Sequence, residues 1–264
     1  MISKYKLLEF APAIDLLGNV ARAAGEIIFD WTPIEVPKGT VCLKTLQCVI
    51  TGNNGVDVVG TRDLELFYAK NIDGVAPPTL GTSGAAITAA TAATCRRHII
   101  GRSFMDGSGM RGSVHLLGYN VWSFSGNSGN DREDYQLMLD GGDAVYAGTT
   151  PGFQTIWVAA IAETADIDLG TGVVLAMEGS VNLAVSQSPQ TIWVSGTDVR
   201  DVFAVGDELI SFHPTNGSLP KLLGTVTAVN SATEIVVDQV KSITLHGEEI
   251  CFRRPLNFKL GFEY

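Results

Sequence analysis

The segment LNFKLGFEY, residues 256–264, decides how the strands of this 264-residue chain are organised. Its large apolar residues Leu256, Phe258, Leu260 and Phe262 alternate with mostly polar ones, and a two-residue period is typical of a strand with one buried face. A compact set of strands with its own turns precedes this segment. We therefore expect the segment to return to a larger sheet built by earlier residues, so that the compact set is an insertion rather than a tail.

Strand patterns recur upstream, with Gly, Asn and Pro turns between them. Roughly six to eight short strands at such spacing, with a single helical pattern, indicate an all-β fold. The alternation of helices and strands that is typical of α/β enzymes does not occur. The predicted fold class is an antiparallel β-sandwich or jelly roll. The candidate strands are residues 27–32, 40–51, 64–69, 96–104, 114–124, 136–139, 155–161 and 173–177.

A separate small β-barrel is predicted over residues 188–254. The polar segment Ser186–Pro189 separates it from the sandwich, which then takes residues 26–187 and 255–264. A Gly-Asp pair opens one strand of the barrel and Gly-Thr-Val opens the next, an order that resembles SH3-like small barrels. Short turns join the strands. The four strands are residues 205–212, 222–230, 234–238 and 248–252.

Two segments offer little to bury and are expected to act as arms. Residues 1–25 form an arm or a short helix, because apolar residues recur at helical spacing between Ile14 and Ala24. Residues 71–94 are rich in Ala, Gly, Thr and Pro and are predicted to form a long surface loop. Because neither segment is expected to belong to the core, deletion of residues 1–25 should leave the protein folded.

The chain carries few charges, and most of them are acidic. Charged residues make up 17% of the sequence, and 18 Lys and Arg against 28 Asp and Glu give a net charge of −10. An ordinary soluble domain has about 25% charged residues. The basic residues are scattered, which argues against a nucleic-acid partner. A surface poor in charge indicates self-association instead.

The start of the sequence and the cysteines indicate the compartment. Glu9 and Asp15 interrupt the apolar residues before the hydrophobic run of a signal peptide can form. Residues 74–94 are uncharged, but their side chains are mostly small, so the segment is too weakly hydrophobic for a membrane span. The four cysteines show no metal-binding spacing, so buried free thiols are expected, which suits assembly in a reducing cytoplasm. They are Cys42, Cys48, Cys95 and Cys251.

Histidines and serines provide no recognisable catalytic pattern. The histidines are far apart in the sequence, and no HxH or HExxH motif occurs. Ser103 and Ser108 lie at a Gly-rich turn that has neither the G-x-S-x-G nor the P-loop pattern. We therefore expect no enzyme activity, no catalytic residues, no metal ligands and no cofactor. The histidines are His98, His115, His213 and His246.

An acidic loop at residues 127–134 is a candidate calcium site. Its carboxylates and amides are oxygen donors that calcium accepts, but the spacing is not that of an EF-hand, and a solvated loop needs no ion. Asp140 and Asp143 extend the acidic cluster, which admits glycan hydrolysis by a pair of carboxylates as a weaker alternative. The donors of the loop are Asn127, Asn130, Asp131, Glu133 and Asp134.

The tryptophans fall within apolar strand patterns. A core position is therefore expected for them, and a sugar-stacking platform is the minor alternative. They are Trp31, Trp122, Trp157 and Trp193.

The combination of a Gly-rich all-β chain, small-residue loops, few charges and a barrel beside a sandwich resembles structural proteins of tailed-phage virions. Within that class it is most similar to capsid decoration proteins. The resemblance implies a homotrimer that stabilises the shell by clamping the major capsid protein, or other virion proteins, through loops and terminal arms. It also implies location in the virion and assembly in the host cytoplasm, without a membrane partner.

Other functions stay open. A tail or baseplate component is built from the same kinds of module. A carbohydrate-binding β-sandwich would carry exposed aromatic residues and a signal peptide. A jelly-roll enzyme of the cupin kind would carry clustered histidines with the spacing G-x5-H-x-H, and no such cluster occurs.

Overall fold

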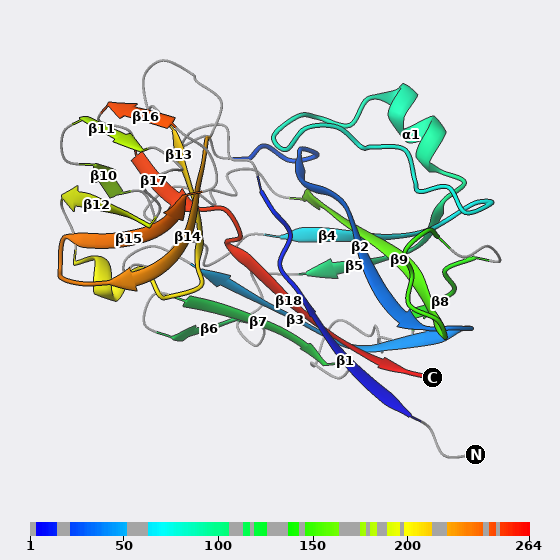
Figure 1. Ribbon diagram of the computed structural model, residues 1–264. Coiled ribbons are helices and arrows are strands. Elements are labelled where there is room, and N and C mark those ends of the chain that lie inside the picture. Colours follow the sequence, from blue (N-terminus) through cyan, green and yellow to red (C-terminus); the bar gives the residue numbers. More distant parts are fainter. Residues whose placement is uncertain are drawn as a thin grey trace.

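The computed structural model shows a sandwich of antiparallel sheets with a β-barrel at one end (Figure 1). The all-β fold class predicted from the sequence is confirmed. None of the helices in the described part of the chain is long and apolar enough to cross a membrane. The structure describes residues 4–14, 22–51, 63–105, 113–116, 119–125, 137–142, 146–163, 175–177, 180–183, 189–195, 198–212, 221–239, 243–246 and 249–264.

The first sheet of the sandwich contains the segment LNFKLGFEY as β18. This strand lies between β1 and β3, where the alternation of its residues buries one face. The predicted strand 114–124 is two strands, β6 and β7. A short strand, β8 (Leu137–Leu139), pairs with the start of β3 beyond the part that β7 covers. In spatial order the main strands are β1 (Tyr5–Phe10), β18 (Leu256–Glu263), β3 (Val41–Thr51), β7 (Tyr119–Ser125) and β6 (Ser113–Leu116).

The second sheet packs against the first. Its strand β9 is buried along most of its length, on both faces, which explains its nearly continuous apolar sequence FQTIWVAAIA. β2 shows two register shifts where it pairs with β9. In spatial order the strands are β2 (Ile27–Pro37), β9 (Phe153–Ala162), β4 (Leu64–Lys70) and β5 (Ile99–Met105).

The order in which the chain visits these sheets defines a jelly roll. β6 only extends the first sheet beyond β7, and the other eight strands form four pairs. The first of them pairs with the last, β1 with β18, and the next pair inward is β2 with β9. β3 then pairs with β7, and β4 with β5. Successive pairs alternate between the two sheets, as in a ribbon of four antiparallel pairs rolled upon itself.

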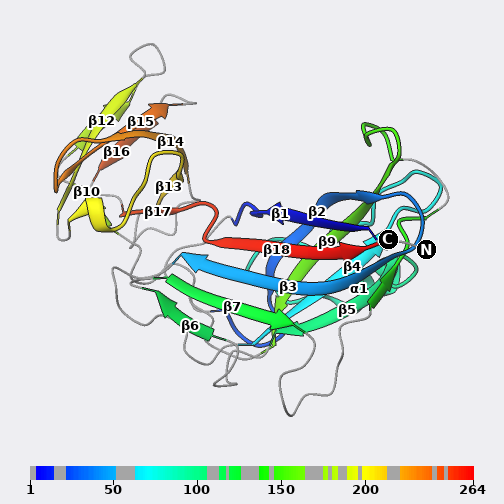
Figure 2. The same ribbon diagram turned by 90° about the horizontal axis from the view of Figure 1, so that it is seen from below.

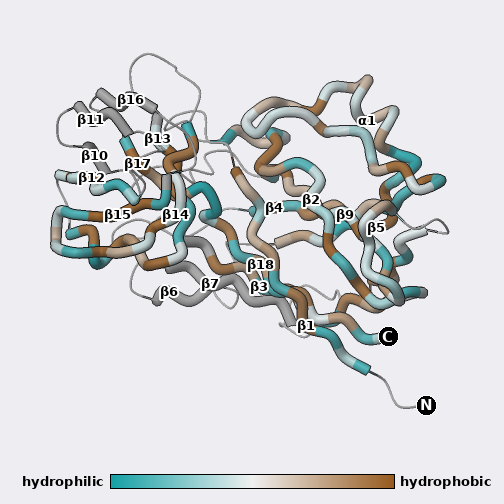
Figure 3. Tube along the Cα trace, viewed as in Figure 1, coloured by the Kyte–Doolittle hydropathy of each residue, from teal (hydrophilic) through white to brown (hydrophobic). Residues whose placement is uncertain are grey.

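Aromatic rings join the two sheets in the core. Phe29 of β2 lies 5.6 Å from Phe258 of β18 and 6.4 Å from Phe10 of β1, measured between ring centroids. Phe10 and Phe258 stack at 5.1 Å. Figure 2 shows the two layers, and Figure 3 shows hydrophobic and hydrophilic residues alternating along β1 and β18.

The barrel is inserted between β9 and β18. β10 lies before residue 188, the predicted start of the barrel, and pairs with both β12 and β17, which closes the ring. A short 3-10 helix, η2 (Val199–Asp201), and a strand pair, β11 (Ser180–Leu183) with β16 (Ile243–His246), accompany it. In order around the ring the strands are β10 (Leu175–Met177), β12 (Gln190–Ser195), β15 (Glu234–Gln239), β14 (Lys221–Val229), β13 (Glu208–Phe212) and β17 (Glu249–Phe252).

The junction between barrel and jelly roll is a cluster of charges. The Glu208 carboxylate accepts hydrogen bonds from Arg253 Nη1 at 2.5 Å and from Arg254 Nε at 2.6 Å. Arg254 also donates to the carbonyl oxygen of Ala11. Desolvation raises the pKa of Glu208, but the hydrogen bonds from the two arginines outweigh it and lower the pKa overall. These bonds tie the barrel to the connection that enters β18.

Residues 71–98 cover the outer face of the second sheet. Most of residues 71–94 form turns and loops at the surface, as predicted, but they pack on this sheet and do not extend as the predicted arm. They contain a helix, α1 (Ala89–Cys95). Asp30 of β2 accepts a hydrogen bond from the backbone N–H of Leu80 at 2.9 Å, and Trp31 Nε1 donates to the carbonyl oxygen of Pro78 at 2.9 Å. The segment therefore packs within its own domain. A small second core lies beneath it, formed by Ile27, Leu80, Cys95 and Ala159.

The N-terminal segment also differs from the prediction of an arm or helix. Tyr5–Phe10 form β1, and Leu8 and Phe10 pack against the core. The backbone N–H of Ile14 donates to the carbonyl oxygen of Arg253 at 2.8 Å. The centre of the predicted helix, residues 15–21, lies outside the described residues. The strand forms because YKLLEF alternates, which satisfies an edge position beside β18.

Candidate interaction surface

The first sheet ends at β1, and within the described residues no strand pairs with its other edge. Lys4 and Tyr264 exchange two backbone hydrogen bonds, of 3.1 and 3.0 Å. Hydrogen-bonded and non-hydrogen-bonded residue pairs alternate along antiparallel strands. Because Lys4 is hydrogen-bonded to its partner, the backbone N–H and C=O groups of Tyr5, Leu7 and Glu9 face away from β18. Outward N–H and C=O groups of this kind can bind an additional strand.

Exposed apolar side chains lie on the outer face of β1. Tyr5 is 71% exposed and Leu7 is 70% exposed. The neighbour of Leu7 across β18 is Gly261, where a Cβ would collide with Oγ1 of Thr45. A glycine at this position leaves one flank of Leu7 without a covering side chain.

A third exposed apolar side chain on this face is Met138, which is 59% exposed and is separated from Tyr5 by Glu263 and Cys42. Tyr5, Glu263, Cys42 and Met138 stand opposite one another on successive strands and therefore share the outer face. Glu263 is held by an ion pair with Lys44 at 3.1 Å. We call Tyr5, Leu7 and Met138 the outer patch.

The inner face of β1 is tied to the second sheet by Lys6. Lys6 Nζ donates to the carbonyl oxygen of Glu35 at 3.0 Å and lies 4.0 Å from the ring centroid of Phe153. The Glu35 carboxylate accepts hydrogen bonds from the backbone N–H of Thr150 at 2.8 Å and from its hydroxyl at 2.7 Å. These two bonds, the backbone one first, lower the pKa of Glu35. β1 is thus held in place by both sheets, and its open edge is preorganised.

A second exposed aromatic residue lies on the barrel. Trp193 of β12 is 47% exposed and stands opposite Glu234 of β15. The prediction of a core position is wrong for this residue, because it occupies the outward position of an alternating barrel strand whose inward neighbours are Ile192 and Val194. Asn230 Nδ2 donates to Glu234 Oε1 at 2.8 Å. An aromatic face beside a carboxylate and an amide has the chemistry of a sugar-binding surface.

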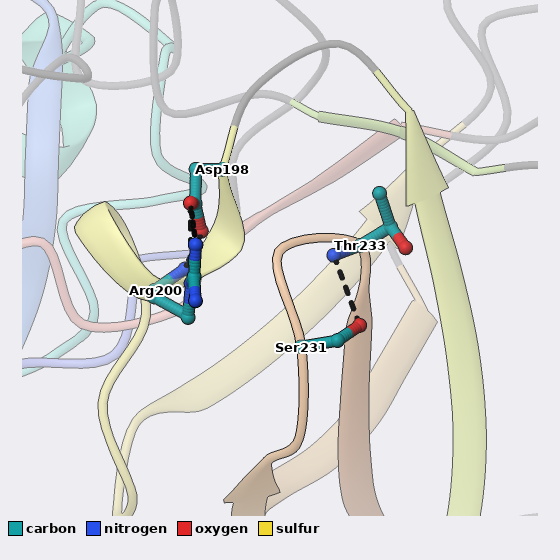
Figure 4. A network of polar contacts seen from close by, with 4 residues as sticks. All are labelled: Asp198, Arg200, Ser231 and Thr233. Atoms are coloured by element: carbon teal, nitrogen blue, oxygen red, sulfur yellow. Dashed lines mark hydrogen bonds and ion pairs between the residues drawn. The ribbon is translucent and has the colours of Figure 1, made fainter.

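Polar contacts near one end of the barrel close local turns (Figure 4). The Asp198 carboxylate binds the guanidinium of Arg200, whose hydrogen bonds lower the pKa of Asp198 to about 2. The backbone N–H of Thr233 donates to Ser231 Oγ at 3.3 Å. Because each bond joins residues two positions apart, these groups stabilise turns and do not converge on a ligand.

The structure does not bring the predicted histidines and serines together as a site. His98 is buried, with Nδ1 2.9 Å from the carbonyl oxygen of Lys70, and Ser103 donates to the Tyr68 hydroxyl at 3.2 Å. His115 and His246 lie in β6 and β16. Across the described ranges, no three His, Cys, Asp or Glu side chains form a group that could hold a metal. Of the predicted histidines and serines, Ser108 and His213 lie outside the described residues.

The acidic loop 127–134 lies outside the described residues, as does Asp143, so calcium binding there stays a prediction. Asp140 is exposed, and its Oδ1 accepts a hydrogen bond from the backbone N–H of Gly142 at 3.0 Å. This bond closes a turn between β8 and the loop after it.

The remaining predictions concern burial. Trp157 lies in the core as predicted, and Trp31 is half-buried. Trp122 lies in β7, but the structure does not describe its side chain. The four cysteines are buried, as predicted.

Sequence comparison finds no matching family model and no matching curated protein. Among solved structures, the infectious bursal disease virus VP2 subviral particle matches with a TM-score of 0.21 and 8% identity, over 99% of this chain and 41% of that chain. The structure of Cucumber Necrosis Virus matches with a TM-score of 0.17 and 10% identity, over 98% and 95%. Matches with such low TM-scores do not indicate a function for this chain. Its function is inferred from strand pairing and surface chemistry instead.

Proposed function

We propose that this chain is a non-enzymatic structural protein of a virion, specifically a decoration protein that stabilises a capsid shell. The observation that carries the proposal is the open edge of β1 on a jelly roll, together with the outer patch beside it. Jelly rolls build capsids, but they also occur in lectins and cupins, so the fold alone does not choose between functions. An unprotected sheet edge with exposed apolar residues favours assembly.

The layout of the molecule suits attachment to a shell. The barrel stands at one end of the jelly roll, and both ends of the described chain lie at the other (Figure 2). One end can therefore contact a shell while the other points outward. In the proposal, contact with the major capsid protein, or with other virion proteins, is made by the outer face of the first sheet, which leaves the backbone edge of β1 to a second copy. Copies associate with one another in the trimer that the family resemblance implies, and the particle assembles in the host cytoplasm.

Co-expression with the virion genes of the same genome tests the proposal. Particles are separated on a density gradient, and we expect the chain in the band of assembled shells. Leu7→Glu with Met138→Glu, which charges the outer patch, should fold normally but remain at the top of the gradient. Recovery of the wild-type chain with tails instead of shells would identify a tail or baseplate component. Its absence from every particle band would refute the virion role.

Carbohydrate binding is the second candidate, because Trp193 is exposed beside Glu234. Titration with a panel of oligosaccharides, followed by tryptophan fluorescence, tests it. Saturable quenching that is lost in Trp193→Ala and retained in Thr191→Ala, on the same strand, would support this function. Unchanged fluorescence across the panel would refute it.

A further inference from the structure

We propose that β1 pairs with β1 of a second copy, antiparallel about a twofold axis at Leu7, so that the first sheets of two jelly rolls become one sheet. The inference deepens the proposed function by naming a contact between copies, and the occupant of the open edge is the chain itself. In a shell of trimers, this twofold contact joins one trimer to the next.

The backbone of β1 fits this pairing. The outward groups belong to Tyr5, Leu7 and Glu9, which are spaced symmetrically about Leu7. A twofold axis at Leu7 places Leu7 opposite Leu7 of the second copy, and Tyr5 opposite Glu9. All outward N–H and C=O groups of the three residues then find partners, because each is in a hydrogen-bonding position on both strands.

The side chains of the outer face are also self-complementary. The two Leu7 side chains meet at the axis, where each is 70% exposed in the single chain. The Tyr5 hydroxyl of one copy comes next to the Glu9 carboxylate of the other, so that a donor faces an acceptor. No two like charges stand directly opposite each other in this register. Lys6 points to the inner face, where it binds the carbonyl oxygen of Glu35 within its own chain.

The edges of the second sheet differ from that of β1. β2 contains Pro33 and Pro37 and shows two register shifts, and β5 pairs with β4 through another shift. Prolines and bulges are devices that prevent edge-to-edge pairing. β1 has neither, and its register with β18 runs without interruption from Tyr5 to Phe10. The structure therefore protects β2 and leaves β1 available.

Disulfide trapping in the full-length protein tests the register. In Leu7→Cys the two new thiols lie on a bonded pair, with Cα atoms about 5.5 Å apart, a separation that a disulfide spans. In Tyr5→Cys the same atoms are about 14 Å apart along the strands and cannot be bridged. The native cysteines are buried, so background cross-linking is low. On mild oxidation we expect most Leu7→Cys protein as covalent dimer and Tyr5→Cys protein as single chains.

A second pair of variants tests the backbone bonds without cross-linking. Leu7→Pro removes an outward N–H and no bond to β18, and proline is tolerated at such edge positions. We expect sedimentation to show at least a tenfold weaker association for Leu7→Pro and an unchanged one for Leu7→Val, with both variants folded.

The outcomes separate this contact from the proposed function. Equal cross-linking of Tyr5→Cys and Leu7→Cys, or none in either variant on free protein and on particles, would overturn β1 pairing. Wild-type association that survives Leu7→Pro would overturn it as well. In each case, recovery of the chain in shell bands would leave the virion role standing.

Discussion

Asn71 holds together three segments that are distant in the sequence. Its Oδ1 accepts a hydrogen bond from Trp157 Nε1 at 2.8 Å, and its Nδ2 donates to the carbonyl oxygen of Gly141 at 3.4 Å. Gln154 extends the network, because its Oε1 accepts from the N–H of Gly141 at 3.1 Å. Buried polar groups of this kind are costly when one partner is removed.

We expect Asn71→Leu to lower the free energy of unfolding by about 2–3 kcal/mol, because the Trp157 N–H is left buried without its acceptor. Urea denaturation at pH 7 measures the change. In a Trp157→Phe background the same substitution should cost about 1 kcal/mol less, since no indole N–H then remains. Equal costs in the two backgrounds would show that the bond between Asn71 and Trp157 contributes little.

Glu208 gives the junction a dependence on pH. Its pKa in the folded protein lies below the ordinary 4.5, so its stabilising contribution is present above about pH 4.5 and is lost as the pH falls through the folded pKa. Glu208→Gln should be less stable than wild type by about 1 kcal/mol at pH 7, and the difference should shrink at lower pH. Thermal unfolding across this range measures it. Glu163→Gln, at an exposed position, should stay within about 0.5 kcal/mol of wild type.

Individual residues of the candidate surface were only partly predictable from the sequence. The alternation in residues 5–10 carries the signal for β1, but helical spacing between Ile14 and Ala24 favours a short helix. That Leu7 is exposed depends on Gly261, which β18 brings opposite it. Likewise, Trp193 shares the pattern Gln-Thr-Ile-Trp-Val with Trp157, yet one is exposed and the other buried. The local pattern is the same, but Tyr146 and Asn71 contact the ring of Trp157, whereas Trp193 is 47% exposed on the barrel.

At the scale of single strands, β1 contributes to the stability of the folded protein because it is part of the first sheet. Deletion of residues 1–10 should destabilise the protein, because it uncovers β18 and removes Leu8 and Phe10 from the core. We expect a loss of about 3 kcal/mol, or about 6–12 °C in Tm. Differential scanning calorimetry measures it. An unchanged Tm would restore the interpretation of this segment as an arm.

The strands themselves were largely predictable, because alternation and turn residues are local signals. The segment 71–98 shows where local signals end. Its residues Leu80 and Cys95 pack with Ile27 and Ala159, and a sequence with few large side chains does not reveal that a sheet face elsewhere needs a cover. β10 differs in kind, because the sequence predicted a strand at residues 173–177 but assigned it to the sandwich. Its place in the barrel depends on its neighbours β12 and β17.

At the scale of the whole molecule, the residue boundaries of the barrel domain can be tested directly. A fragment of residues 175–254 contains all the ring strands, whereas a fragment of residues 188–254 lacks β10 and leaves β12 and β17 unpaired on one side. We expect dispersed amide resonances and cooperative unfolding from the longer fragment, and a collapsed or broadened spectrum from the shorter one. Equally dispersed spectra would show that β10 is dispensable for closure.

The pairing of the first strand with the last has a consequence for synthesis on the ribosome. β1 emerges before any other strand of the roll, but its partner β18 emerges only after the entire barrel. The barrel is complete once β17 is released, so it can fold while β1 and β3 still wait for the strand that lies between them. Contacts over such separations form slowly. Nascent chains therefore expose the unpaired edges of β1 and β3 for the longest time, which makes this stage the one most in need of chaperone protection.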